Sequence, residues 1–120
     1  MRLKLSAADL TGAYLFGANL SQANLRGIQL INADLRKANL SRADLQGAYL
    51  LLANLRKADL RGARLTGAFL NGADLTGARL SRADLTDADL TNAIVNQSDI
   101  DNAILCRTRL PWGDISRDCG

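Results

Sequence analysis

A leucine, isoleucine or valine occupies every fifth position of this 120-residue chain from Leu5 to Ile115, and from Leu5 to Leu90 the residue is always leucine. Alanine stands two positions before most of these residues. On an α-helix, five residues turn through about 500°, so successive leucines would lie about 140° apart and scatter around the whole surface. In a straight strand they would alternate between the two faces, because five is odd. Neither regular element explains the period.

The pattern instead predicts that each five-residue unit is a short extended segment followed by a bend. Alanine and leucine are two positions apart, so both side chains point the same way from an extended backbone. Eight of the ten glycines come two positions after a leucine, where a bend with a positive φ angle would select glycine. They are Gly12, Gly17, Gly27, Gly47, Gly62, Gly67, Gly72 and Gly77. One unit alone buries little, so the sequence predicts that the units stack as a solenoid.

A second period, of twenty residues, indicates how many units form one coil. The tetrapeptide LRKA occurs at 35–38 and again at 55–58. Charges of alternating sign recur at the same interval in Asp44, Arg64 and Asp84, and in Asp59, Arg79 and Asp99. With four units per coil these charges would lie about 4.8 Å apart on adjacent coils, and we expect them to form ion-pair ladders. The chain would then make about five to six coils.

The tandem Ala-[Asp/Asn]-Leu-x-x units resemble the pentapeptide-repeat family. Copies include ADLTG at 8–12, ANLSQ at 18–22, ADLRK at 33–37 and ADLTD at 83–87. The resemblance covers about residues 3–117. It implies an all-β fold, the right-handed quadrilateral parallel β-helix of that family, and the handedness comes from the resemblance alone. We therefore expect a single pentapeptide-repeat β-helix over residues 1–117.

The pattern decays toward the C-terminus, where we expect an irregular tail or cap over residues 106–120. Ser98 and Thr108 replace the repeat alanine, and Pro111 and Trp112 follow. We expect Trp112 to lie over the last coil. The segment CRTRLPWGDISRDCG is loosely similar to tails of family members, chiefly cyanobacterial ones.

Cys106 and Cys119 are thirteen residues apart near this end. They would form a disulfide that fixes the tail in an oxidising compartment, or stay free thiols in a reducing cytosol. Their spacing does not decide between these alternatives. Two cysteines in a chain without histidine make a poor metal site, so we expect no metal.

Sorting the outward positions by the twenty-residue coil gathers apolar side chains on one face. The candidate interface residues are Ile31, Tyr49, Leu51, Leu52 and Phe69. Tyr49 and Phe69 are twenty residues apart, so their rings would stack on adjacent coils. A contiguous exposed apolar patch often marks an interface. The alternative is that these side chains pack on one another and only cover the backbone.

A second outward cluster is basic. The candidate basic patch consists of Arg36, Lys37, Arg56 and Lys57, with Arg42, Arg61 and Arg82 around the corner. Like charges on adjacent coils repel, so the cluster could serve an anionic partner. The alternative is an ordinary solvated face.

The residues offer no catalytic constellation. Serines such as Ser21, Ser41 and Ser81 have no histidine to activate them. The aspartates before the leucines occupy repeat positions, and the glycines belong to bends rather than to a phosphate-binding loop. We therefore expect no enzymatic activity and no cofactor.

These observations favour a non-catalytic interaction or scaffold protein, whose partner would be an unknown protein or a second copy of the chain. One alternative comes from the family resemblance, because some pentapeptide-repeat proteins imitate duplex DNA and inhibit DNA gyrase. Those proteins are acidic and dimeric, whereas this chain has a net charge of +3. A further alternative is an anionic partner on the basic face. Nucleic acid is disfavoured there, because no aromatic residues interleave the charges.

The sequence also bears on localisation. No window approaches the roughly 20 apolar residues of a membrane span. The N-terminal segment MRLKLSAADL has no apolar stretch of signal-peptide length. We therefore expect a soluble, cytoplasmic protein without a membrane span, with an oxidising compartment as the alternative if the chain is processed.

Overall fold

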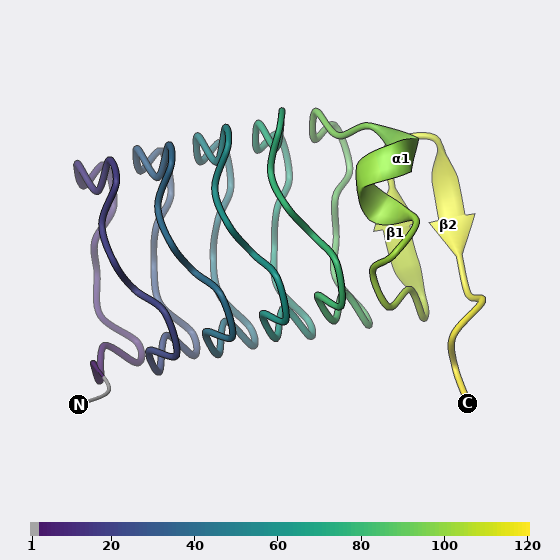
Figure 1. The fold of residues 1–120 in the computed structure, drawn as a ribbon, viewed down its shortest axis with the longest axis horizontal. Coiled ribbons are helices and arrows are strands. Elements are labelled where there is room, and N and C mark those ends of the chain that lie inside the picture. The colour runs from purple at the N-terminus through teal and green to yellow at the C-terminus, as the bar shows by residue number, and fades with distance from the viewer. Residues whose placement is uncertain (1–2) are drawn as a thin grey trace.

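The computed structural model describes residues 3–120, and most of them form a stack of coils around a common axis (Figure 1). Short parallel bridges join residues that are twenty apart, such as Asp44 with Arg64 and Tyr49 with Phe69. Each coil therefore contains four five-residue units, in agreement with the twenty-residue period. The two ends of the chain lie at opposite ends of the stack (Figure 1).

Backbone hydrogen bonds connect each inner coil to both of its neighbours. The N–H of Leu45 donates to the carbonyl of Arg64 on the following coil at 2.7 Å. The N–H of Asp44 donates to the carbonyl of Ala23 on the preceding coil at 2.9 Å. Within a coil, the N–H of Ala48 donates to the carbonyl of Leu45 at 3.0 Å and closes the bend. The repeat thus pairs backbone groups along the stack, which a solenoid of such short segments requires.

The leucines and alanines of the repeat form one narrow hydrophobic core along the axis. The leucines at the five-residue positions from Leu20 to Leu90 are all buried, and so are the alanines from Ala23 to Ala93. This confirms the inward orientation that the five-residue period predicts. Fully burying one leucine contributes about 1.5–3 kcal/mol, and the small alanine lets the coil close tightly beside it.

The second residue after each leucine has a positive φ angle along most of the repeat. The angle lies between +64° and +72° at the eight repeat glycines, which confirms their place in the bends. Other residues adopt the same conformation where glycine is missing: Ala7, Gln22, Asn32, Lys37, Arg42, Leu52, Lys57, Arg82, Asp87, Asn92 and Arg107. A left-handed backbone costs a residue with a Cβ atom roughly 1–2 kcal/mol. The stacked coils must therefore impose the bend at these positions.

Where the residue before the leucine is aspartate or asparagine, its side chain stabilises the bend from outside in most units. Asp74 accepts the N–H and the hydroxyl of Thr76 on its Oδ1 atom, at 3.0 and 2.6 Å. Asp44 accepts the N–H of Gln46 in the same way at 3.2 Å. Such local side-chain acceptors favour turns. This explains why aspartate and asparagine recur at this position.

The prediction of ion-pair ladders from the charge pattern is wrong, although the predicted twenty-residue register between adjacent coils is confirmed. Asp44 is bridged to Arg64 through the backbone, but its carboxylate lies 3.9 Å from Arg26. The carboxylate of Asp59 pairs with Arg61 of its own coil at 2.7 Å. Each of these two carboxylates accepts the N–H of the second residue after it, Gln46 or Arg61, and neither forms an ion pair with Arg64 or Arg79.

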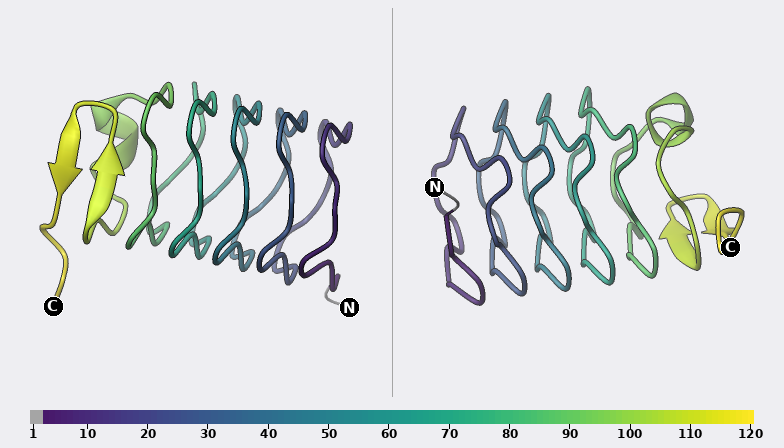
Figure 2. Two further views of the ribbon diagram at one scale, coloured as in Figure 1. Left: turned by 180° about the vertical axis from the view of Figure 1, so that it is seen from behind. Right: turned by 60° about the horizontal axis from the view of Figure 1, so that its bottom comes forward.

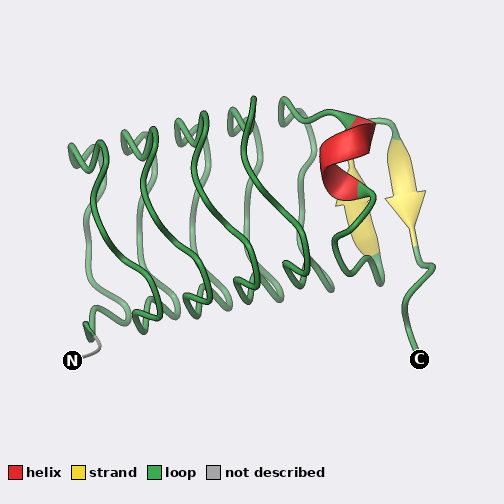
Figure 3. Cartoon of the chain, viewed as in Figure 1, coloured by secondary structure: helices red, strands yellow, loops and turns green. Residues whose placement is uncertain are grey.

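The repeat is interrupted after Val95. Helix α1, Gln97–Ile100, takes the place of a bend. Strands β1, Thr108–Leu110, and β2, Gly113–Ile115, then form an antiparallel hairpin at the end of the stack (Figures 2 and 3). The segment 106–120, expected to be irregular, therefore contains a short two-stranded sheet. Among residues 3–120, no helix is long and apolar enough to cross a membrane.

Trp112 lies in the turn of this hairpin and is 46% exposed, so it is not buried in the core as a plug. Leu110 is buried in the core, and Ile115 packs partly against it. Thr108 takes an alanine position and is fully buried, and its hydroxyl donates to the carbonyl of Leu85 at 2.8 Å. The inward residues of the hairpin, rather than the largest side chain, close the core.

Side chains of the tail attach it to the last coil. The guanidinium of Arg117 donates to the carbonyl of Ala103 at 3.0 Å, and a carboxylate oxygen of Asp118 accepts the N–H of Leu105 at 2.9 Å. A disulfide joins Cys106 and Cys119, whose Cα atoms are 4.9 Å apart. The end of the solenoid is thus held by contacts that occur once in the chain.

Candidate functional site

Tyr49 and Phe69 form a stacked aromatic pair on the outside of two adjacent coils. Their ring centroids are 5.2 Å apart and the ring planes differ by 8°. The N–H of Tyr49 donates to the carbonyl of Ile28, and the N–H of Phe69 to that of Ala48, each at 2.9 Å. Tyr49 is 41% exposed and Phe69 is 39% exposed. The two rings are therefore half-exposed as a stacked pair on a backbone that is hydrogen-bonded to the neighbouring coils.

Apolar side chains continue from this pair around the adjacent bend. Ile31 and Leu51 are half-buried, while Leu52 is 60% exposed. Leu52 leans over Gly72 on the next coil, since a Cβ atom at Gly72 would lie 2.8 Å from Cδ2 of Leu52. The structure thus brings the five candidate interface residues together on one side. We call this surface, formed by Ile31, Tyr49, Leu51, Leu52 and Phe69, the aromatic stripe.

A polar hollow adjoins the aromatic stripe toward the C-terminus. Its volume is about 570 Å³, and it is lined by Phe69, Asp87, Asp89, Arg107, Arg109, Asp114 and Ser116. Arg107 pairs with Asp87 at 2.7 Å, and this hydrogen bond holds the pKa of Asp87 below its ordinary value. Sequence reasoning missed the hollow because Asp114 reaches it from β2. The available signals were two pairs of opposite charge at the twenty-residue spacing, Asp87 with Arg107 and Asp89 with Arg109.

The candidate basic patch is assembled as expected, but carboxylates neutralise half of it. Arg36 makes two hydrogen bonds of 2.8 Å to Asp34, which lower the pKa of Asp34 and raise that of Arg36. Arg56 pairs with Asp74 at 3.3 Å. The patch is therefore less positive than its sequence indicates. Arg36 and Lys37 lie over the ring of Phe16, at 5.2 and 5.8 Å from its centre. The expectation that no aromatic residue accompanies these charges is therefore wrong.

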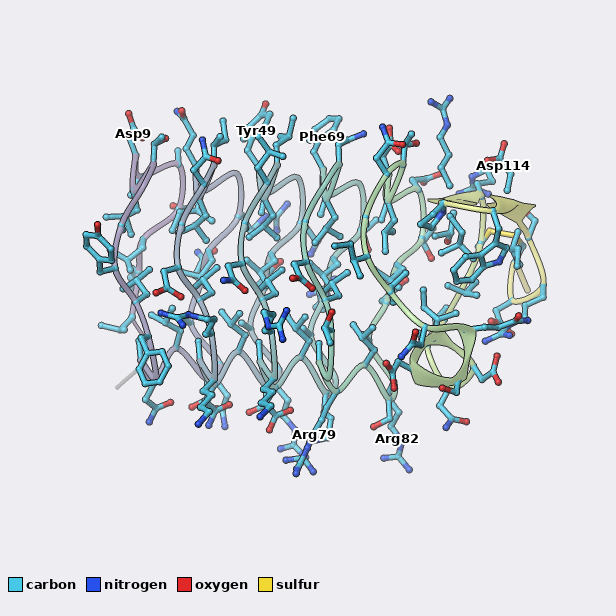
Figure 4. All side chains as sticks on the ribbon, turned by 90° about the horizontal axis from the view of Figure 1, so that it is seen from above. Asp9, Tyr49, Phe69, Arg79, Arg82 and Asp114 are labelled. Carbon is cyan, nitrogen blue, oxygen red and sulfur yellow. A yellow bond between two sulfur atoms is a disulfide. The ribbon has the colours of Figure 1, made fainter. Side chains whose placement is uncertain are left out.

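The arginines around the corner border a separate groove. Its volume is about 870 Å³, and it is lined by Ser21, Gln22, Asn39, Ser41, Arg42, Arg61, Gly62, Ser81, Arg82 and Asn102. Figure 4 shows Arg82 along the opposite edge of the molecule from Tyr49 and Phe69. We call this surface the arginine groove. The fold thus carries two distinct candidate surfaces on opposite sides.

The described residues show no metal-binding cluster. Within residues 3–120, no three histidine, cysteine or acidic side chains are close enough to hold an ion. The aspartates before the repeat leucines from Asp9 to Asp89 cap bends, as Asp9 shows by accepting both the N–H and the hydroxyl of Thr11.

Comparison with known proteins gives a consistent result. A family model described as pentapeptide repeats, in eight copies, matches residues 13–50, 53–92, 70–105 and 83–117. A crystal structure of a pentapeptide repeat protein from Nostoc PCC 7120 is 37% identical, with 82% of this chain and 79% of that chain covered and a TM-score of 0.70. No curated protein matches.

Two further solved structures are similar. HetL from Nostoc sp. strain PCC 7120, a pentapeptide repeat protein involved in heterocyst differentiation regulation, is 34% identical over 93% of this chain and 59% of its own, with a TM-score of 0.51. A pentapeptide repeat protein of the Arabidopsis thaliana thylakoid lumen is 27% identical over 88% of this chain and 63% of its own, with a TM-score of 0.57. The similarity includes cyanobacterial proteins.

Proposed function

The chain belongs to the pentapeptide-repeat family, and from that premise we propose that it is a non-catalytic interaction module that contacts a partner protein through the aromatic stripe. The observation that carries the proposal is the half-exposed stack of Tyr49 and Phe69. Tyrosine and other large aromatic residues are enriched at the energetic centres of protein interfaces.

Rigidity supports this role. The backbone of the stripe is hydrogen-bonded to coils on both sides, as the bonds from Tyr49 to Ile28 and from Leu50 to Phe69 illustrate. Two rings that are already stacked lose little conformational freedom when a partner covers them. The stripe would therefore bind without first having to fold or rearrange.

The surroundings of the stripe suggest the chemistry of the partner. Phe69 borders both the apolar side chains and the polar hollow that contains the Arg107–Asp87 pair. An interface commonly has an apolar centre and a polar rim. A complementary protein surface would place apolar side chains on the rings and hydrogen-bonding groups over the hollow.

The test is affinity capture from a lysate of the source organism, followed by a binding measurement with each captured protein after purification. The stripe variant carries Tyr49→Ser, Leu51→Ser and Phe69→Ser. The matched control carries Tyr14→Ser, Phe16→Ser and Ile94→Ser, three exposed apolar residues outside the stripe. We expect a purified partner to bind the wild type and the control similarly, and the stripe variant at least about tenfold more weakly.

Equal binding of a partner by all three proteins would contradict the proposal, provided that circular dichroism shows them folded. A second copy of the chain is the other possible occupant. Sedimentation of the purified wild type would then show a dimer that the stripe variant abolishes, and this result would replace the partner protein with self-association.

The disulfide bears on localisation. A bond between Cys106 and Cys119 supports the oxidising compartment over the reducing cytoplasm, because cytosolic thiols are kept reduced. We therefore propose that the protein works where disulfides persist. Thiol labelling of the protein immediately after lysis of its native cells tests this point. Blocked thiols are expected, and two free thiols would restore the cytoplasmic assignment.

A further inference from the structure

We propose that the arginine groove is a second binding site, which takes an extended acidic peptide segment rich in aspartate or glutamate. The groove lies on the opposite side of the solenoid from the aromatic stripe (Figure 4). The two sites would therefore be occupied independently.

The charge of the groove is the first argument. Its ten lining residues include three arginines and no carboxylate. Arg61 pairs with Asp59 beside the groove at 2.7 Å. Arg42 and Arg82 form no ion pair with any carboxylate in residues 3–120, unlike Arg36 and its bidentate partner. Two guanidinium groups are thus available to an anion.

The backbone at these two arginines is the second argument. Arg42 and Arg82 have φ angles of +56° and +61°, at the bend position that glycine occupies in eight other units. The left-handed conformation favours glycine there. Neither side chain offsets the strain with an internal ion pair. Bends of the same conformation form with glycine in eight other units, so the fold does not require arginine at these two positions.

Gly62 separates the two arginines and keeps the groove open. It occupies the same position on the intervening coil, and a Cβ atom there would lie 3.3 Å from Cγ of Arg42. The backbones of Arg42 and Arg82 are two coils apart, or about 9.6 Å at the usual strand spacing. An extended peptide advances about 3.3 Å per residue. Carboxylates two or three residues apart would reach both guanidinium groups.

Neutral hydrogen-bond donors and acceptors in the groove also suit the backbone of a peptide. Ser21, Ser41 and Ser81 line the groove at equivalent positions, and the Ser41 hydroxyl already donates to Oδ1 of Asn39 at 2.7 Å. From Ser21 to Asn102 the groove crosses four coil spacings, roughly 19 Å, the length of about six extended residues. Hydroxyls and amides along this path can bond a peptide backbone, while the arginines bind its carboxylates.

The same lining argues against a nucleic-acid strand. Binding of single strands relies on aromatic side chains that stack with the bases. None of the ten lining residues is aromatic. The proposal therefore commits to an acidic peptide and makes the nucleic acid an outcome of the test.

The experiment compares two variants with the same change in charge at the same kind of backbone position. One carries Arg42→Gly and Arg82→Gly. The matched control carries Lys37→Gly and Lys57→Gly, whose φ angles of +58° and +60° are equivalent. Glycine fits all four positions, so both variants should fold, and circular dichroism checks this. The probe is a fluorescent octaglutamate peptide at about 50 mM salt, where charged contacts are weakly screened.

We expect octaglutamate to bind the wild type and the lysine control with similar dissociation constants, and the arginine variant at least about tenfold more weakly. Absence of binding to the wild type would overturn the proposal. Equal weakening of octaglutamate binding in both variants would also overturn the proposal, because it would indicate attraction by net charge alone. Tighter binding of an octathymidylate strand than of octaglutamate would replace the peptide with nucleic acid. The variant of the aromatic stripe should retain the peptide, so this proposal and the proposed function can fail separately.

Discussion

The ring of Phe69 stacks on the ring of Tyr49 with 5.2 Å between centroids, although the two residues are twenty positions apart in the chain. This contact exists because the parallel bridge between Tyr49 and Phe69 fixes the register of two adjacent coils. The same register places every outward side chain directly beside its counterpart on the next coil. Surface function in this protein therefore follows from columns of residues rather than from loops.

The stacked pair should contribute a measurable coupling energy. In a double-mutant cycle with Tyr49→Ala and Phe69→Ala, we expect a coupling free energy of about 0.5–1 kcal/mol from urea unfolding, because stacked aromatic pairs gain energy beyond their buried area. The control cycle combines Tyr14→Ala with Phe69→Ala, which are not in contact and should be additive. A coupling energy of zero for the stacked pair would contradict the observed geometry.

The buried leucine ladder should dominate stability. Leu55→Ala should lower the free energy of unfolding by about 2–5 kcal/mol, because the side chain is fully buried and its loss leaves a cavity in a narrow core. Leu52→Ala, the matched exposed leucine of the aromatic stripe, should cost less than about 1 kcal/mol. The measurement is chemical denaturation of both variants beside the wild type. Similar losses for the two leucines would be inconsistent with the inward and outward assignment.

The C-terminal end should depend on the disulfide. Reduction of the bond between Cys106 and Cys119 should lower the free energy of unfolding by about 2–4 kcal/mol, because the closed loop restricts the unfolded chain. Limited proteolysis should then cut the segment 113–120 first. Cys119→Ser should show the same instability without reductant and no further response to it. Unchanged melting of the wild type in reductant would refute this role.

Acid should loosen the same end. The N–H of Leu105 and then the side chain of Arg117 hold the pKa of Asp118 below its ordinary value. A carboxylate with a lowered folded-state pKa stabilises the fold above the unfolded pKa, about 3.9 for aspartate, and this contribution is lost as the pH falls through the folded-state value. The melting temperature of Asp118→Asn should therefore decline less than that of the wild type between about pH 5 and pH 2. Equal declines in the melting temperatures of the variant and the wild type would show that Asp118 does not contribute to the pH dependence of stability.

The repeating part of the fold could be predicted from the sequence, because each unit repeats the same interactions. Leucine at every fifth position and glycine two positions later are enough to predict an inward ladder and a left-handed bend, and Leu55 and Gly67 behave accordingly. The twenty-residue echo likewise predicts the stacking of Tyr49 on Phe69. Contacts that recur in every unit are therefore visible in the sequence as residues that recur at the same spacing.

The end of the fold could not be predicted, because its contacts occur once. Nothing in the spacing indicates that Arg117 donates to the carbonyl of Ala103, or that β2 brings Asp114 to the hollow that Phe69 also lines. The charge pattern misled for a related reason. The twenty-residue spacing of Asp44 and Arg64 reflects the register of the coils, but the capping of local bends decides where the carboxylate of Asp44 points.

The central claim is that the aromatic stripe is covered by a partner in the cell, and the two tyrosines of the chain provide the most direct test. Tyr14 is 91% exposed and lies outside the stripe, so it serves as an internal control for Tyr49. The rates of acetylation of both phenols by N-acetylimidazole would be measured by mass spectrometry, for the purified protein alone and in a lysate of its own cells. We expect the lysate to slow the reaction of Tyr49 several-fold and to leave Tyr14 unchanged. Equal rates for Tyr49 in both conditions would contradict the claim.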